Sequence, residues 1–206
     1  MDNILVHDCL VIGEHAKVGL WFAALFLTMK GIFIMELNLY RIVPKYIDAL
    51  RDETNGGDKR VYDVRNGKEH RPFVGVVVVC NGQKYCIPLT SYKKRFENMR
   101  DKIDITRIII DGEIKGAVEF SRMIPIEDAQ LRNLDMLYHK HDTEGQRQNK
   151  NNRIETLKWC REHSDDIVNK ANVLYNMYIS GQDFKRKKDC LNFIALEEVC
   201  KKYNEK

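Results

Sequence analysis

A short polar segment, residues 90–95, carries two hydroxyl groups and three cationic side chains directly after an apolar run. Its members are Thr90, Ser91, Tyr92, Lys93, Lys94 and Arg95. Cations stabilise the charge that develops on a phosphate during transesterification, and a hydroxyl group can hold a phosphate oxygen or relay a proton. Lys93 could also give a proton if neighbouring cations or burial lowered its pKa. This combination fits the cleavage of RNA by its own 2′-hydroxyl group, a reaction that requires no metal.

The same residues have two other interpretations. Thr90 and Ser91 could cap a following helix, because hydroxyl groups accept hydrogen bonds from the first backbone amides of a helix. Alternatively, the segment belongs to a non-catalytic RNA-binding module, in which the cations bind phosphates and the hydroxyl groups only position them. The pattern of residues leaves these alternatives open.

A β-hairpin should support this polar segment. Residues 73–80 are an unbroken apolar run rich in β-branched side chains, which is typical of a strand buried on both faces. Asn81-Gly82 then supplies the positive φ values of a two-residue type I′ turn, so the next run should return antiparallel. Pro88 cannot donate a backbone hydrogen bond and is expected at an edge or where pairing ends.

The rest of the chain alternates less regularly, with short strands first and helices later. The predicted elements are strands at 36–43 and 105–110, a tight turn at Asp111-Gly112, a return through 117–120, a short helix from Pro44, helical periodicity from Asn149 with a restart at 164–166 and an end at Gly181, and a last helix at 192–203. This order predicts an α+β fold in which helices flank a twisted antiparallel sheet.

Composition and motifs narrow the chemistry. The net charge of +4 permits a polyanionic partner. The sequence contains no P-loop, no GxGxxG, no HExxH and no acidic cluster suited to magnesium, so neither a metal nor another cofactor is expected. His139, His141 and Asp142 could bind a metal if folded to suit, but a solvated loop is favoured. The basic run 184–188 is by default an exposed linker, although it would also suit a phosphate backbone.

Cysteine usage points to a reducing compartment. The six cysteines, at positions 9, 80, 86, 160, 190 and 200, show no CxxC spacing. We therefore expect reduced thiols and a cytoplasmic protein rather than a zinc site or a disulfide framework.

Residues 1–34 differ from the rest of the chain. They contain an apolar run, residues 18–29, that is too short to span a bilayer. Acidic residues precede it where a signal peptide would carry basic ones. We expect Met35 to be the natural start, so that 1–34 is an extension that need not belong to the native protein and 35–206 is a single functional domain. The alternative is a membrane-tethered regulator that uses Trp21 to Met35 as an anchor.

Several blocks of this sequence, in the same order, resemble the ToxN/AbiQ family, the toxins of type III toxin–antitoxin systems. The blocks are RPFVG at 71–75, KYCIPLTSYKK at 84–94, RMIPI at 122–126, HSDDIVNKANVLYN at 163–176, NF at 192–193 and LEEVCKKY at 196–203. The likeness covers about residues 36–203, and PLTSxKK is its most specific element. It does not extend to residues 1–34.

The resemblance implies a metal-independent endoribonuclease that leaves a 2′,3′-cyclic phosphate, with a barrel-type fold akin to the MazF and Kid toxins. It also implies inhibition by a repeated small RNA that folds as a pseudoknot and joins the toxin in a closed hetero-oligomer. The implied substrates are cellular or phage RNA, and the implied role is often abortive infection. No stable association with a membrane is expected.

The family's functional residues map onto particular positions of this chain. Its hydroxyl pair corresponds to Thr90 and Ser91, and its essential lysine to Lys93, so these are the predicted catalytic residues. The predicted RNA-binding residues are Arg71, Lys94, Arg95 and Tyr62. Two departures matter: Tyr92 stands where a relative has proline, and the loop before Arg71 differs, which makes Tyr62 only a candidate for an upstream tyrosine.

Overall fold

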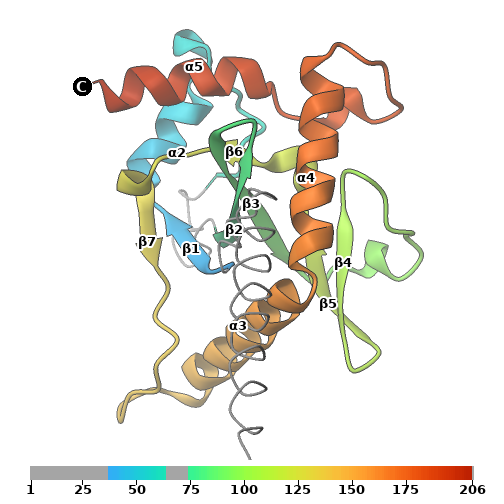
Figure 1. Ribbon diagram of the computed structural model, residues 1–206. Coiled ribbons are helices and arrows are strands. Elements are labelled where there is room, and N and C mark those ends of the chain that lie inside the picture. Colours follow the sequence, from blue (N-terminus) through green and yellow to red (C-terminus); the bar gives the residue numbers. More distant parts are fainter. Residues whose placement is uncertain (1–36, 64–73, 206) are drawn as a thin grey trace, which may run out of the picture. The chain divides into compact units, whose positions relative to one another are not determined.

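The computed structural model describes residues 37–63 and 74–205, which form an antiparallel sheet with helices packed against it (Figure 1). In this part of the chain the sheet has seven strands, in the order β4-β5-β3-β2-β1-β7, with β6 beside β3. The strands are β1 (Leu39–Ile42), β2 (Val74–Cys80), β3 (Gln83–Ser91), β4 (Thr106–Ile110), β5 (Glu113–Val118), β6 (Ile124–Pro125) and β7 (Leu131–Asn133). The α+β prediction is therefore confirmed.

Four α-helices and five short 3-10 helices complete the described structure. The α-helices are α2 (Pro44–Arg51), α3 (Glu144–Glu162), α4 (Ser164–Ile179) and α5 (Phe193–Asn204), and the 3-10 helices are η1 (Glu53–Asn55), η2 (Lys94–Phe96), η3 (Phe120–Arg122), η4 (Asp128–Gln130) and η5 (Lys187–Asp189). Helix α4 packs against β2, α3 reaches β4, and α2 and α5 contact each other (Figure 1).

Both predicted tight turns are present. Asn81 and Gly82 have φ values of 48° and 83°, and Asp111 and Gly112 have values of 51° and 79°. These left-handed conformations let two residues join each pair of strands. The pairing of β3 with β2 ends, within the described residues, at Gly75 and Pro88, so Pro88 lies where that ladder stops.

Strand β3 changes partners along its length. Its first part pairs with β2 and β6, whereas Leu89, Thr90 and Ser91 pair with Val118, Ala117 and Gly116 of β5. At Gly116 an added Cβ atom would lie 2.2 Å from the Thr90 carbonyl oxygen. Only glycine allows β5 to approach this closely, so Gly116 fixes the end of β3.

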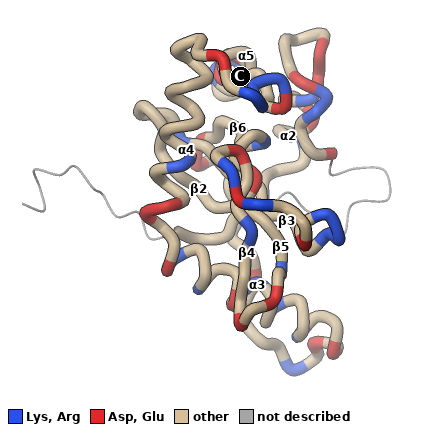
Figure 2. Tube along the Cα trace, turned by 90° about the vertical axis from the view of Figure 1, so that its right-hand side faces the viewer, with Lys and Arg blue, Asp and Glu red and all other residues tan. Residues whose placement is uncertain are grey.

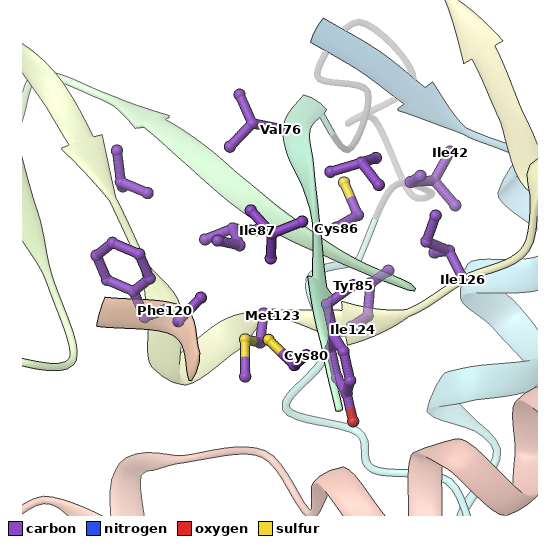
Figure 3. Close-up of a cluster of buried hydrophobic side chains, with 14 of the residues drawn as sticks. Ile42, Val76, Cys80, Tyr85, Cys86, Ile87, Phe120, Met123, Ile124 and Ile126 are labelled. Carbon is purple, nitrogen blue, oxygen red and sulfur yellow. The ribbon is translucent and has the colours of Figure 1, made fainter. Parts of the chain in front are cut away.

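The core joins the hairpin to the C-terminal helices. Tyr85 of β3 and Tyr175 of α4 both donate hydrogen bonds to one oxygen of Glu197 in α5, at 2.6 and 2.8 Å. Figure 3 shows part of the surrounding apolar cluster, in which Phe120, Met123 and Ile124 join side chains of the central hairpin. The hairpin therefore shares its core with α4 and α5.

Helix α3 begins at Glu144, earlier than the predicted Asn149. Thr143 accepts a hydrogen bond from the Gln146 backbone amide, and the Gln146 side chain accepts one from the Thr143 amide. This capping box starts the helix in a polar stretch where no apolar periodicity could reveal it. The restart at 164–166 and the end at Gly181, where φ is 75°, are confirmed.

The barrel predicted from the resemblance is not confirmed, because the described sheet is open. Strand β4 pairs only with β5, and the three-residue strand β7 pairs only with β1, so no ladder joins these two edges. None of the helices in 37–63 and 74–205 has the length and hydrophobicity needed to cross a bilayer. Residues 1–36, with the predicted extension and anchor, lie outside the described residues.

Candidate active site at the end of strand β3

Thr90 and Ser91 are the last two residues of β3, and neither caps a helix. The residue that precedes η2 is Lys93, and no side chain caps that helix. The capping interpretation is therefore wrong, because these residues belong to the sheet. Thr90 is half-buried and Ser91 is exposed.

The two hydroxyl groups have different surroundings. Side chains alternate along a strand, so Thr90 shares the face of its partner Ala117, which packs against Phe96 of η2. Ser91 shares the opposite face with Leu89. Both Thr90 and Ser91 contribute to the wall of a cleft of about 420 Å³, so this cleft lies at the end of the strand.

Helix α3 supplies the polar side of this cleft, and the sheet supplies its apolar side. The α3 residues are Asn149, Asn152, Arg153, Glu155 and Thr156, and the apolar residues are Leu39, Leu89, Ile108 and Ile110. Amide side chains both donate and accept hydrogen bonds, and an apolar floor suits a flat ring. The cleft therefore has the chemistry to hold a nucleobase beside Ser91. The α3 residues were not predicted as part of the site.

The predicted cations follow the strand after one residue, Tyr92. Lys93, Lys94 and Arg95 are exposed, whereas Phe96 is fully buried and anchors η2. The Phe96 amide donates to the Lys93 carbonyl at 2.8 Å. Because Lys93 is exposed, its side chain can reach a bound phosphate.

A buried carboxylate that the sequence analysis missed connects two predicted residues. Glu119 is 4% exposed; one of its oxygens accepts a hydrogen bond from the Tyr62 hydroxyl, and the other pairs with Arg95 at 3.2 Å. Burial, followed by the bond to Glu119, raises the pKa of the Tyr62 phenol. The Glu119 amide also donates to the Pro88 carbonyl at 3.1 Å. This cluster therefore lies directly beside β3.

Of the other predicted residues, Arg71 lies outside the described residues. The segment with His139, His141 and Asp142 is a loop attached to α3, because Asp142 pairs with the buried Lys150 at 2.9 Å. No group of three potential metal-ligating side chains was found in 37–63 and 74–205. The five cysteines in that part of the chain are free and buried, and burial raises the pKa of the Cys160 thiol to about 12.

The sequence matches one protein family and is similar to known relatives. The family model for the toxin ToxN of type III toxin–antitoxin systems matches residues 38–201. The chain is similar to the endoribonuclease ToxN of Pectobacterium atrosepticum, with 30% identity over 168 residues that cover 79% of this chain and 91% of the relative. It is also similar to the endoribonuclease AbiQ of Lactococcus lactis subsp. lactis, with 29% identity over 188 residues that cover 86% and 94% of the two chains.

A solved structure has the same fold. It is described as "A processed non-coding RNA regulates a bacterial antiviral system", and it superposes with a TM-score of 0.65 and 28% sequence identity, covering 82% of this chain and 98% of the other.

Proposed function

Because the chain belongs to the family of ToxN toxins of type III toxin–antitoxin systems, we propose that it is an endoribonuclease whose active site is the end of β3. The 2′-hydroxyl oxygen attacks the adjacent phosphorus and the bond to the 5′-oxygen breaks. The attacking group loses its proton and the departing 5′-oxygen receives one. The products are a 2′,3′-cyclic phosphate and a 5′-hydroxyl group, and no metal takes part.

Each residue of the site has a role in this proposal. Lys93 stabilises the charge of the phosphorane, and the hydroxyl groups of Thr90 and Ser91 hold its oxygens or relay a proton. The flanking phosphates are bound by the cations, which are Lys94, Arg95 and, as a prediction, Arg71. Tyr62 contacts the RNA from the Glu119 cluster.

One observation carries the proposal most directly. Two hydroxyl residues stand at the end of a strand that Gly116 fixes in place, close in sequence to exposed cations and beside a cleft of about 420 Å³. A preorganised arrangement stabilises a transition state without rearrangement during the reaction. A mobile basic loop would bind RNA without this advantage.

The proposed partners follow from the family. We propose that a cognate RNA, a repeated pseudoknot, inhibits the chain in a closed hetero-oligomer in the cytoplasm, and that cellular or phage RNA is the substrate during abortive infection. The related structure in which a processed non-coding RNA regulates an antiviral system supports an RNA regulator. Kinship with the MazF and Kid toxins stays a prediction.

The test uses the purified full chain, freed of bound RNA, and a labelled RNA in the presence of EDTA. We expect fragments that end in a 2′,3′-cyclic phosphate, because the proposed chemistry uses only side chains and the RNA. Fragments with 3′-hydroxyl ends, or activity that EDTA removes, would contradict the mechanism. Tight binding with intact RNA would instead favour the non-catalytic RNA-binding module.

A further inference from the structure

A second, basic cleft shares no residue with the one beside Ser91. It has a volume of about 540 Å³ and is lined by Lys102, Ile103, Asp104, Phe184, Lys185, Arg186, Lys188 and Asp189. These residues come from the loop before β4 and from the basic run between α4 and α5. Figure 2 shows that basic and acidic positions are interspersed along the chain. A cleft with more basic than acidic residues therefore differs from the described chain as a whole.

The basic run is held in place and is not a loose linker. Arg186 Nε lies 2.6 Å from an oxygen of Asp104, which is only 1% exposed, and Arg186 Nη2 lies 3.3 Å from Asp189. Arg60 donates to the Lys188 carbonyl at 2.9 Å. An ion pair with a buried partner and a hydrogen bond from a distant arginine therefore fix the cleft's wall.

The charge that remains in the cleft is positive. Both carboxylates, Asp104 and Asp189, pair with Arg186. Lys102, Lys185 and Lys188 are exposed, and no ion pair joins them to a carboxylate of the described residues. Phe184 lines the same cleft, is half-buried and packs against the main core. The cleft thus combines ammonium groups with one aromatic side chain held by the fold.

We propose that this cleft binds single-stranded RNA, with successive phosphates on Lys102, Lys185 and Lys188 and one base against Phe184. The inference rests on the proposed function and extends it to a second contact with RNA. Stacking on an aromatic ring beside cations is how proteins bind unpaired strands, whereas the bases of a duplex are already stacked on each other. Several lysines around one cleft suit a chain of phosphates better than a single anion.

The test measures binding separately from cleavage. The full chain carries Ser91→Ala, and the probe is an unstructured, fluorescent RNA of about twelve nucleotides, titrated by anisotropy between about 50 and 200 mM salt. Adding Lys185→Ala and Lys188→Ala should weaken binding about tenfold and reduce the salt slope by about 1.4, the value for two lost contacts to a single strand.

The matched control removes two exposed lysines elsewhere. Lys45→Ala and Lys140→Ala change the net charge equally, so they should lower the affinity much less. Equal losses from the two double variants would overturn the proposal, because only overall charge would then matter.

Phe184→Leu tests the base contact. It keeps an apolar side chain against the core, and we expect weaker binding with an unchanged salt slope, for the unstructured RNA but not for a hairpin duplex of the same length. No effect of Phe184→Leu on the unstructured RNA would refute single-strand recognition. If wild-type protein fails to cleave RNA while these binding differences persist, the nuclease proposal fails and the second RNA site stands.

Discussion

Ser91 and Lys93 are the residues on which cleavage should depend most. Ser91 is exposed at the end of β3, and Lys93 precedes η2 with its ammonium group in solvent. Ser91→Ala and Lys93→Ala should each lower the rate of cleavage by about 100-fold or more while RNA binding changes little, because transition-state contacts are lost. Single-turnover rates and binding constants separate these effects.

Lys45→Ala is the control for these two variants, since it removes an exposed charge from α2. It should leave the cleavage rate unchanged. Variants at Ser91 and Lys93 that weaken binding and cleavage to the same extent would argue against a catalytic role.

Glu119 is expected to act as a positioning residue. Glu119→Gln retains the shape of the side chain but removes the charge that pairs with Arg95. We expect several-fold slower cleavage and a free energy of unfolding lower by about 1 kcal/mol, because a neutral amide makes weaker hydrogen bonds than a carboxylate. Glu113→Gln is the control, since it makes the same charge change on an exposed side chain of β5.

Two readouts, the temperature of the assay and a conservative substitution, distinguish positioning from a general loss of stability. If Glu119 only supports the fold, Glu119→Gln should cleave RNA as fast as wild type when both are assayed at a lower temperature at which the variant is fully folded. Persistent slow cleavage in a fully folded variant, together with rescue by Glu119→Asp, would support the positioning role.

The β3 and β5 strands meet at a position that tolerates only glycine. In Gly116→Ala the new Cβ atom would lie 2.2 Å from the Thr90 carbonyl oxygen, so the strands must separate. We expect the free energy of unfolding to fall by about 1–3 kcal/mol. The rate of cleavage should fall by more than the loss of folded protein explains. Urea unfolding and RNA cleavage measure the two effects.

Gly145→Ala provides the matched control in helix α3. An added Cβ atom has no neighbour within 4 Å there, and alanine has the higher helix propensity. This variant should be neutral or slightly more stable. A Gly116→Ala protein with normal activity would mean that the strand end need not be held so closely.

Asp142, in the loop before α3, should make the free energy of unfolding depend on pH in the acidic range. The His139 backbone amide and the Lys150 ammonium donate to Asp142 and lower the pKa of its carboxyl group. Because the pKa of Asp142 is lower in the folded protein than in the unfolded chain, the carboxylate stabilises the fold above the unfolded-chain pKa of about 3.9. This stabilisation is lost as the pH falls through the pKa of the folded protein. The difference in free energy of unfolding between wild type and Asp142→Asn should shrink from pH 6 to pH 3, as measured by urea unfolding at each pH.

Local signals in the sequence predicted the elements that depend on neighbouring residues. The Asn81-Gly82 turn, the restart of the helix at Ser164 and its end near Gly181 each require only a few adjacent residues. Strand β7 was not predicted, because its three residues pair with β1 far away in the sequence. The cluster of Tyr62, Arg95 and Glu119 depends on the register of β5 against β3, which no local pattern contains.

The described residues also contain a large hydrophobic core. The main cluster extends from Leu37 to Cys200, and the family match covers 38–201. We therefore propose that residues 35–206 are the functional domain. A chain that begins at Met35 should unfold at the same temperature as the full chain and cleave RNA at the same rate; aggregation or loss of activity would show that residues 1–34 are required.

The contacts of Glu197 imply an order in which the site becomes complete during synthesis. Tyr85 receives its hydrogen-bond acceptor only when α5 exists, and the cleft beside Ser91 gains its helical wall only when α3 exists. A nascent chain that still lacks these helices has its hydroxyl groups but not their support. On the proposed function, the ribosome would have to synthesise α3 and α5 before the polypeptide could cleave RNA, which leaves time for an inhibitory RNA to reach it first.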